Sequence, residues 1–223
     1  MAPSLVDTLI EKPSDSLQLL ARDRYFNSAV LVPFISINGE DHLVFEKRAE
    51  NIRQGSEICF PGGMHDPDTD KNCKDTAVRE TVEELGIARD TIQVLGHFGT
   101  LVAPIGAFVD VFLGRLEIKG IEDINANPHE VETVFTLPFS YFINQPPETY
   151  QARVVIEPSY IDIDGREVVL LPSKELKLPP RYHKPWGKIA HRILVYPSDY
   201  GAIWGFTGEI IHDMVKKTVK NNP

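Results

Sequence analysis

The sequence predicts an α/β (α+β) fold in which helices cover a mixed β-sheet, and three observations support this class. Apolar runs typical of strands outnumber segments typical of helices. The main helical patterns, at residues 72–86 and 207–219, lie between the strands and after the last of them, so they are available to cover a sheet. The chain has 223 residues, of which 42% are hydrophobic and 25% charged, as in an ordinary globular protein able to bury a core.

The expected domain organisation follows from where the regular patterns begin. We expect residues 1–26 to form a loose arm or a short helix, and residues 27–223 to form a single domain without internal repeats. The N-terminus lacks the basic and long apolar regions of a secretory signal. Cys59 and Cys73 are too few for a disulfide scaffold, so we expect two mostly buried thiols in a cytoplasmic protein.

The charge balance restricts the classes of partner. With 23 basic and 32 acidic side chains, the formal net charge is −9 at neutral pH. Nucleic acid and anionic membranes attract basic surfaces, so we expect neither as a partner. A phosphorylated small molecule stays compatible with this charge, because a metal ion can reverse the local sign. A homodimer is kept as an alternative to a monomer.

A β-hairpin is predicted near the start of the domain. Asn38-Gly39 separates the apolar run at residues 29–37 from a partner strand at 42–48, and an Asn-Gly pair in this position favours a two-residue hairpin turn. A short apolar piece follows at residues 58–60. We expect it to stop in a loop at Pro61-Gly62-Gly63, because proline and glycine interrupt regular structure.

The later elements are predicted from their apolar periodicity and their end signals. A helix over residues 72–86 should end at Gly86, since glycine accepts the left-handed backbone of a C-cap. Segment 146–190 is rich in proline and predicts one hairpin plus irregular loops. A terminal amphipathic helix is expected at 207–219. Its apolar side comprises Ile210, Ile211, Met214, Val215 and Val219. The remaining expected elements are strands at 92–99, 107–116, 131–137 and 191–196, a loop at 118–129 and a short helix at 138–142.

The helix over residues 72–86 carries a cluster of carboxylates. At 100° per residue its apolar side chains form one stripe, and three glutamates gather on the opposite side. These glutamates are Glu80, Glu83 and Glu84. Like charges at this spacing repel, so two interpretations are open: a solvated surface, or a face that holds a cation. Oxygen ligands suit Mg²⁺ or Mn²⁺, which also bind phosphate oxygens, and Arg79 on the flank can pair with a carboxylate.

The segment before this helix favours the second interpretation. Gly62-Gly63 follows a short apolar strand, and glycines let a backbone turn tightly and approach a ligand closely. A strand, a glycine pair, an acidic loop and a helix with three carboxylates together predict a site for metal and phosphate.

The stretch Gly63–Ile87 resembles the Nudix box, G-x5-E-x7-R-E-U-x-E-E-x-G-U, in which U is aliphatic. The half R-E-x-x-E-E-x-G is complete at Arg79–Gly86, and its chance occurrence in such a chain is about one in a few thousand. The first half differs from the box pattern, because the stretch from Gly63 to Arg79 is two residues longer than the pattern allows and Lys71 stands where the pattern has Glu. Thr81 also replaces an aliphatic residue. A nearby aspartate could replace the missing Glu, and the sequence leaves the choice open between Asp66, Asp68 and Asp70.

A narrower resemblance, to the Nudix coenzyme A diphosphatases, extends over about residues 27–212. The F-P-G-G of that subfamily is present at Phe60–Gly63. Further matches are Thr76-Ala77-Val78-Arg79-Glu80, Asn127-Pro128-His129-Glu130-Val131 and Trp204-Gly205-Phe206-Thr207. Between Arg53 and Phe60 the chain is one residue shorter than the subfamily's basic loop, which is thought to confer the preference for coenzyme A.

The resemblance implies a Nudix-type α/β/α sandwich around a mixed β-sheet. It also implies metal-dependent hydrolysis of a nucleotide diphosphate, with Mg²⁺ or Mn²⁺ as cofactor. The implied metal ligands are Glu80, Glu83 and Glu84. The implied catalytic residues are Glu83, Glu84, Glu130 and Arg79, and the implied substrate-binding residues are Arg48, Arg53, Gly62 and Gly63.

Several alternatives stay open at this level. Taken alone, Glu130 is a surface residue, whereas the resemblance makes it an extra metal ligand or the base; which glutamate takes the proton from water is undecided. Coenzyme A would give 4′-phosphopantetheine and adenosine 3′,5′-bisphosphate, and the alternative substrate is ADP-ribose or another nucleoside-diphosphate derivative. A Nudix-fold binding module that has lost catalysis is the non-enzyme alternative. Such modules usually lose box carboxylates, whereas Glu80, Glu83 and Glu84 all remain here beside Arg79, and this favours an enzyme.

Overall fold

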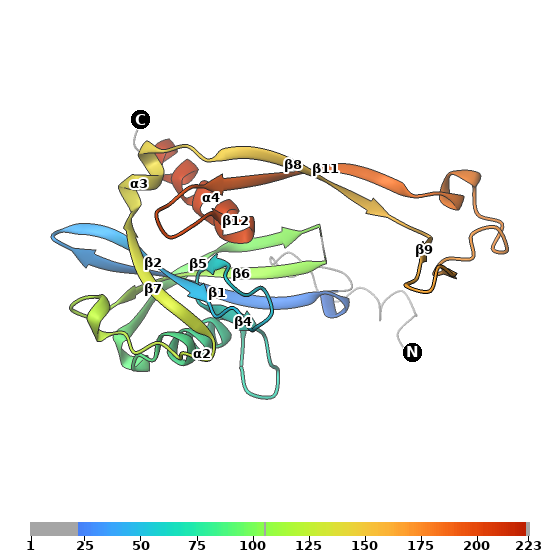
Figure 1. Ribbon diagram of the computed structural model, residues 1–223. Coiled ribbons are helices and arrows are strands. Elements are labelled where there is room, and N and C mark those ends of the chain that lie inside the picture. Colours follow the sequence, from blue (N-terminus) through green and yellow to red (C-terminus); the bar gives the residue numbers. More distant parts are fainter. Residues whose placement is uncertain (1–21, 105, 222–223) are drawn as a thin grey trace, which may run out of the picture.

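A seven-stranded mixed sheet forms the centre of the computed structural model, which describes residues 22–104 and 106–221 (Figure 1). Five strands follow the order β3-β2-β1-β6-β5, with β4 paired to β1 and β7 paired to β2. β1 and β6 are parallel, and the other pairs are antiparallel. The strands are β1 (Phe26–Ile37), β2 (Glu40–Arg48), β3 (Ile58–Cys59), β4 (Gly62–Met64), β5 (Ile92–Ala103), β6 (Ala107–Leu116) and β7 (Val131–Pro138).

The β1–β2 hairpin is confirmed. Phe34 pairs with Leu43 and Ile37 with Glu40 across the antiparallel ladder. Asn38 and Gly39 have φ angles of 53° and 84°, the left-handed values that a two-residue turn of this kind requires at both central positions. Here the sequence pattern alone determined both the turn and the register.

Helix α2 (Cys73–Leu85) covers one face of the sheet and is also confirmed. Asn72 caps its start by accepting hydrogen bonds from the backbone N–H groups of Lys74 and Asp75. Gly86 ends the helix at φ 61°, and a Cβ there would lie 1.8 Å from the carbonyl oxygen of Asn125. The helix packs through Ala77 and Leu85, against apolar residues that include Ala29, Leu31, Ile35, Val44 and Phe112.

The opposite face is covered by α3 (Phe139–Asn144) and α4 (Gly205–Asn221), which completes the predicted α/β/α sandwich (Figure 1). Ile210, Ile211 and Met214 of α4 are buried in the larger core cluster together with Phe45. Val219, predicted on the same apolar side, is 55% exposed, because it lies in the last turn of α4. Short 3₁₀ helices occupy Arg22–Arg24, Arg89–Thr91, Ile121–Asp123 and Pro180–His183.

Two boundaries of the sheet differ from the sequence prediction. Gly62 and Gly63 were expected in a loop, yet they belong to β4 and pair with Val30 and Ala29 of β1. The strand expected to end at 99 continues to Ala103, because β5 absorbs its glycines in irregularities of the register. In the described residues no helix is long and apolar enough to cross a membrane.

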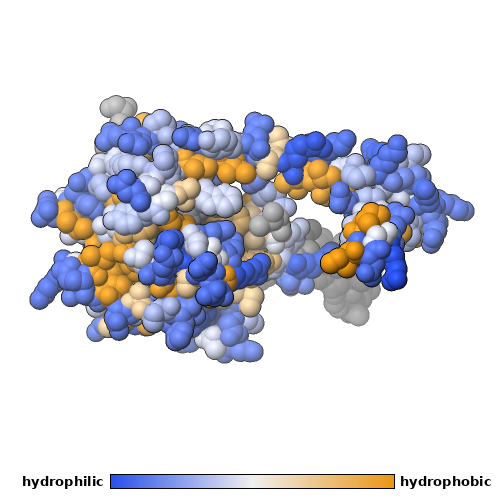
Figure 2. Space-filling model, in the orientation of Figure 1, coloured by the Kyte–Doolittle hydropathy of each residue, from blue (hydrophilic) through white to orange (hydrophobic). Residues whose placement is uncertain are grey.

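The largest error of the sequence prediction concerns a projecting antiparallel ribbon (Figure 1). β8 (Glu148–Ile156) pairs with β11 (Trp186–Tyr196), whereas one hairpin plus irregular loops was expected over residues 146–190 and a strand only at 191–196. Most side chains of β8 are exposed, so its sequence lacks the alternation of apolar and polar residues that indicates a half-buried strand. The far end carries the small hairpin β9 (Ser159–Ile161) and β10 (Glu167–Val169), and apolar surface is visible there (Figure 2). β12 (Ile203–Trp204) pairs with the other end of β11. The arm or helix predicted for residues 1–26 lies mostly outside the described residues.

Candidate active site

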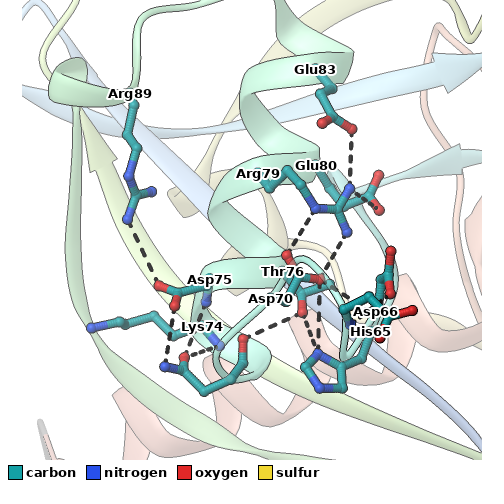
Figure 3. Close-up of polar contacts among 12 residues, drawn as sticks. His65, Asp66, Asp70, Lys74, Asp75, Thr76, Arg79, Glu80, Glu83 and Arg89 are labelled. Carbon is teal, nitrogen blue, oxygen red and sulfur yellow. Dashed lines mark hydrogen bonds and ion pairs between the residues drawn. The ribbon is translucent and has the colours of Figure 1, made fainter.

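The guanidinium group of Arg79 holds three carboxylates around α2, and we call this group the Arg79 cluster (Figure 3). Its Nε and Nη2 atoms donate to the two carboxylate oxygens of Asp70, both at 2.9 Å. Its Nη1 atom donates to Glu80 at 2.9 Å and to Glu83 at 3.1 Å. The predicted pairing of Arg79 with a helix carboxylate is therefore present.

Asp70 is the aspartate of the acidic loop that reaches the helix. It is 5% exposed, and its bidentate contact with Arg79 holds the pKa of its carboxyl group well below the usual value. Asp66 instead accepts a hydrogen bond from the N–H of Asp68 within the loop itself. Of the three aspartates near the position of the missing box Glu, the structure thus places Asp70 against Arg79, as its ion-pair partner.

A second group, the Arg48 cluster, lies deeper and comprises Arg48, Glu84 and Glu46. Glu84 is 3% exposed, and its Oε2 accepts a hydrogen bond of 2.8 Å from the N–H of Gly62. The Nη1 of Arg48 lies 3.4 Å from Oε1 of Glu84 and 3.7 Å from Oε1 of Glu46. The solvated-face interpretation of the helix glutamates is therefore wrong for Glu84.

Glu46 was missed by the sequence analysis and is fully buried on β2. A signal for its position existed: alternate residues of a strand share a face, and Val44 packs in the same core cluster as Leu85 of α2. Glu46 therefore faces the helix carboxylates. Its Oε1 accepts a hydrogen bond from the thiol of Cys59 at 3.3 Å.

The two buried carboxylates of the Arg48 cluster carry more negative charge than their surroundings compensate. Burial raises the pKa of Glu84, and the charge of Glu46 raises it further. Burial likewise raises the pKa of Glu46, against the opposing effects of the Cys59 thiol and Arg48. A buried carboxylate is stable only with a proton or a cation, so this pair either holds a proton or takes a cation partner.

Gly62 and Gly63 let β4 lie tightly between β1 and α2. A Cβ on Gly63 would lie 2.3 Å from the carboxylate of Glu80, and one on Gly62 would lie 2.4 Å from the carbonyl oxygen of Ala29. The glycines thus allow a close approach to the chain's own carboxylate and backbone, and the close approach to a ligand stays a prediction.

The fold brings Glu130 to the same place from a distant part of the sequence. The N–H of Asn127 donates to the carbonyl of Glu84 at 2.9 Å, and the N–H of Ala49 donates to the carbonyl of Glu130 at 2.8 Å. The charge of Glu130 raises the pKa of both Glu46 and Glu80, so its carboxylate belongs to this site electrostatically.

The two arginines predicted to bind substrate have different surroundings. Arg48 lies among carboxylates, and its Nε faces the carbonyl of Arg53 at 3.4 Å. The side chain of Arg53 is exposed, and its guanidinium lies 5.7 Å from the ring centre of Phe26. Arg53 is accordingly available to an incoming phosphate, whereas Arg48 would have to leave its carboxylate partners.

The donor set fits a hard divalent cation, although the side chains do not now converge on one. Within the described residues, no three His, Cys, Asp or Glu side chains form a group that could hold a metal ion. The physical reason is that Arg79 and Arg48 already draw the carboxylates toward themselves. The potential ligands are nevertheless all oxygens, and Oε2 of Glu46 is buried without a hydrogen-bond partner among the described residues. Cys59 and Cys73 are both free thiols and only partly buried.

Comparison with known proteins gives consistent matches. The family model of the NUDIX domain matches residues 26–157. Over 210 residues, 90% of this chain, the sequence is 27% identical to Nudix hydrolase 3 of Caenorhabditis elegans and covers 77% of that protein. It is 36% identical to the mouse (Mus musculus) peroxisomal coenzyme A diphosphatase NUDT7 over 64% of this chain, and 33% identical to the human (Homo sapiens) mitochondrial coenzyme A diphosphatase NUDT8 over 58%. The chain spans little more than half of these two relatives, 56% and 55% of their lengths.

Proposed function

The chain belongs to the NUDIX domain family as a diphosphate hydrolase, and we propose that its substrate is coenzyme A or a coenzyme A thioester. The proposal of this substrate rests on two relatives named as coenzyme A diphosphatases and on the F-P-G-G and N-P-x-E-V segments of the sequence.

The excess of negative charge around α2 is the observation that supports the metal-dependent chemistry. Five carboxylates lie within 4 Å of the guanidinium groups of Arg48 and Arg79, and the charge of a sixth acts on two of these five. The carboxylates are those of Glu46, Asp70, Glu80, Glu83, Glu84 and Glu130. Such a site attracts divalent cations, and a metal ion bound there would allow an anionic diphosphate to approach.

Each residue then has a proposed role in hydrolysis. Glu80, Glu83 and Glu84 would hold Mg²⁺ or Mn²⁺, which when bound neutralises phosphate oxygens and lowers the pKa of water. The water oxygen bonds to one phosphorus while the bridging P–O bond breaks, and the water proton passes to Glu130 or to one of the helix glutamates. With coenzyme A the products are 4′-phosphopantetheine and adenosine 3′,5′-bisphosphate.

Substrate binding is proposed for the loop before the box. Arg53 is free to contact the diphosphate or the 3′-phosphate, and Arg48 could contact it after rearrangement. Gly62 and Gly63 would keep the backbone close to the reacting group, since their neighbours leave no room for a Cβ.

A panel of diphosphates tests the substrate directly. The full chain is incubated with coenzyme A, acetyl coenzyme A, 3′-dephospho-coenzyme A, ADP-ribose and NADH, with Mg²⁺ or with a chelator, and the products are identified by mass. We expect coenzyme A to give the two products above at the highest kcat/KM, only with the cation. A higher kcat/KM for ADP-ribose would refute coenzyme A as the substrate and support the alternative of another nucleoside-diphosphate derivative.

The variant Arg53→Ala supplies a control in the same panel. If Arg53 binds the 3′-phosphate, its loss should lower kcat/KM for coenzyme A roughly tenfold and leave 3′-dephospho-coenzyme A unaffected. An equal loss on both compounds would assign Arg53 to the diphosphate.

The cytoplasmic location, the absence of nucleic acid and membrane partners, and the homodimer alternative remain predictions.

A further inference from the structure

The carboxylate of Glu46 is buried without adequate compensation. The residue is 0% exposed, and its Oε2 has no hydrogen-bond partner among the described residues. Its Oε1 has only the thiol of Cys59 at 3.3 Å and the guanidinium of Arg48 at 3.7 Å. A thiol is a weak donor, and 3.7 Å is too long for a good hydrogen bond. Proteins seldom bury an acidic side chain in this state unless it has a ligand.

The position of Glu46 connects it to the helix carboxylates. Strand alternation directs it to the face of the sheet covered by α2, and it lies opposite Cys59 of β3 and Val134 of β7. One nitrogen of Arg48 lies within 4 Å of both Glu46 and Glu84, so the two carboxylates flank a single positive charge. The charges of Glu80 and Glu130 also act on Glu46.

On the basis of the proposed metal-dependent function, we propose that Glu46 is a further ligand of the divalent cation held by Glu84. Its unpartnered Oε2 supplies an oxygen from the sheet, whereas the ligands that the box implies all come from α2. The contribution of Glu84 alone is limited, because Oε2 of Glu84 already accepts the N–H of Gly62. A ligand from β2 would also fix the cation between the strand and the helix, and so determine where the diphosphate binds.

The competing interpretation gives Glu46 a purely structural role as the partner of Cys59. The two interpretations differ in what Glu46→Gln should do, because glutamine keeps the shape and the acceptor oxygen but removes the charge. If Glu46 has only a structural role, Glu46→Gln should leave the metal affinity of the chain unchanged. If Glu46 is a metal ligand, the Glu46→Gln variant should bind the metal more weakly even when it folds normally.

The test is a titration of the full chain with Mn²⁺ without substrate, in which free Mn²⁺ is followed by electron paramagnetic resonance. Wild type is compared with Glu46→Gln, with Glu84→Gln, and with the control Glu132→Gln, an exposed glutamate on β7 that contacts Lys47. We expect Glu46→Gln to weaken Mn²⁺ binding at least tenfold, in the same direction as Glu84→Gln, while Glu132→Gln binds as wild type does. Cys59→Ala removes the thiol and keeps the carboxylate, so it should retain Mn²⁺ affinity.

Thermal unfolding with and without Mn²⁺ gives a second readout. Without metal, Glu46→Gln should unfold at or above the wild-type Tm, because a buried carboxylate with an unpartnered oxygen is replaced by a neutral amide. With Mn²⁺ it should gain less Tm than wild type. A lower Tm without metal and an undiminished gain with Mn²⁺ would overturn the inference. If Glu46→Gln does not fold, Glu46→Leu, which is apolar and of similar size, is measured in the same way.

The outcomes separate this inference from the function on which it rests. A wild-type chain that does not bind Mn²⁺ at millimolar concentration would refute the metal-dependent mechanism as a whole. A wild-type chain that binds Mn²⁺, together with a Glu46→Gln variant of equal affinity, would refute only the role of Glu46.

Discussion

The Arg79 cluster and the Arg48 cluster contain the same chemical groups but differ in how closely the guanidinium pairs with the carboxylates. In the Arg79 cluster, every donor atom of the guanidinium that makes a contact has a carboxylate within about 3 Å, and the pKa of Asp70 is lowered. In the Arg48 cluster the distances are 3.4 and 3.7 Å, and the pKa values of Glu84 and Glu46 are raised by burial. In the first arrangement the guanidinium pairs closely with every carboxylate, whereas in the second Oε2 of Glu46 is buried without a hydrogen-bond partner among the described residues. Satisfied and unsatisfied carboxylates around a single helix can thus be told apart by geometry.

The largest expected effect is in the Arg48 cluster. Glu84→Gln should reduce turnover at least a hundredfold, because it removes a charge from the proposed metal site while keeping the side-chain shape. Folding should hold, since burial already disfavours the charge of Glu84 and glutamine leaves an oxygen for the N–H of Gly62. Steady-state kinetics and urea unfolding check the two parts. Near-normal activity in the variant would exclude this helix from the mechanism.

The next largest effect is expected at Glu130, whose charge acts on both Glu46 and Glu80. If it accepts the proton from water, Glu130→Gln should lower kcat by about ten- to a hundredfold with little change in KM, as for an interaction made mainly in the transition state. A modest loss that recovers at higher pH would indicate a residue that only orients the water. An unchanged kcat would leave the helix glutamates as the candidates for the base.

For the Arg79 cluster we expect a loss of stability. Asp70→Asn removes the bidentate partner of Arg79 and should lower the free energy of unfolding by about 2 kcal/mol. Turnover per folded molecule should fall much less than in Glu84→Gln, because Glu80 and Glu83 still contact Arg79. Urea unfolding and active-site-normalised kinetics measure the two. A hundredfold loss of turnover with unchanged stability would reverse the roles assigned to the clusters.

Acid unfolding gives a control for that prediction. The pKa of Asp70 is lower in the folded chain than its usual value near 3.9, so its stabilising contribution is complete above about pH 5. That contribution is lost as the pH falls toward the folded pKa. The stability difference between wild type and Asp70→Asn should therefore shrink between about pH 5 and pH 2. A difference that stays constant over this range would show that the ion pair does not cause it.

The smallest effect on stability is expected at Glu83, whose side chain is 52% exposed. Its contact with Arg79 is a surface pair across one helical turn, so Glu83→Gln should change the free energy of unfolding by less than about 0.5 kcal/mol. Turnover should fall less than in Glu84→Gln, because water can replace a ligand in an exposed position. A stability loss comparable to that of Asp70→Asn would show that the outer carboxylates act as one unit.

The sequence by itself determined the elements whose signals are local. Asn38-Gly39 defined the hairpin turn, Asn72 and Gly86 bounded α2, and apolar periodicity gave α4 and most strands of the central sheet. The complete half of the box located the helix that carries Glu80, Glu83 and Glu84. Local backbone preferences suffice for such features, because each depends on neighbours within a few residues.

Tertiary structure alone decided which polar residues come together and which are buried. Glu46, Glu84 and Glu130 are 38 to 84 residues apart in sequence, and only sheet pairing and the packing of α2 bring them to one site. The length and pairing of the β8–β11 ribbon were not predicted beyond a hairpin within 146–190 and a strand at 191–196, because most side chains of its strands are exposed. A carboxylate's pKa depends on desolvation and on charges across the fold, so no sequence pattern could distinguish the satisfied Asp70 from the unsatisfied Glu46.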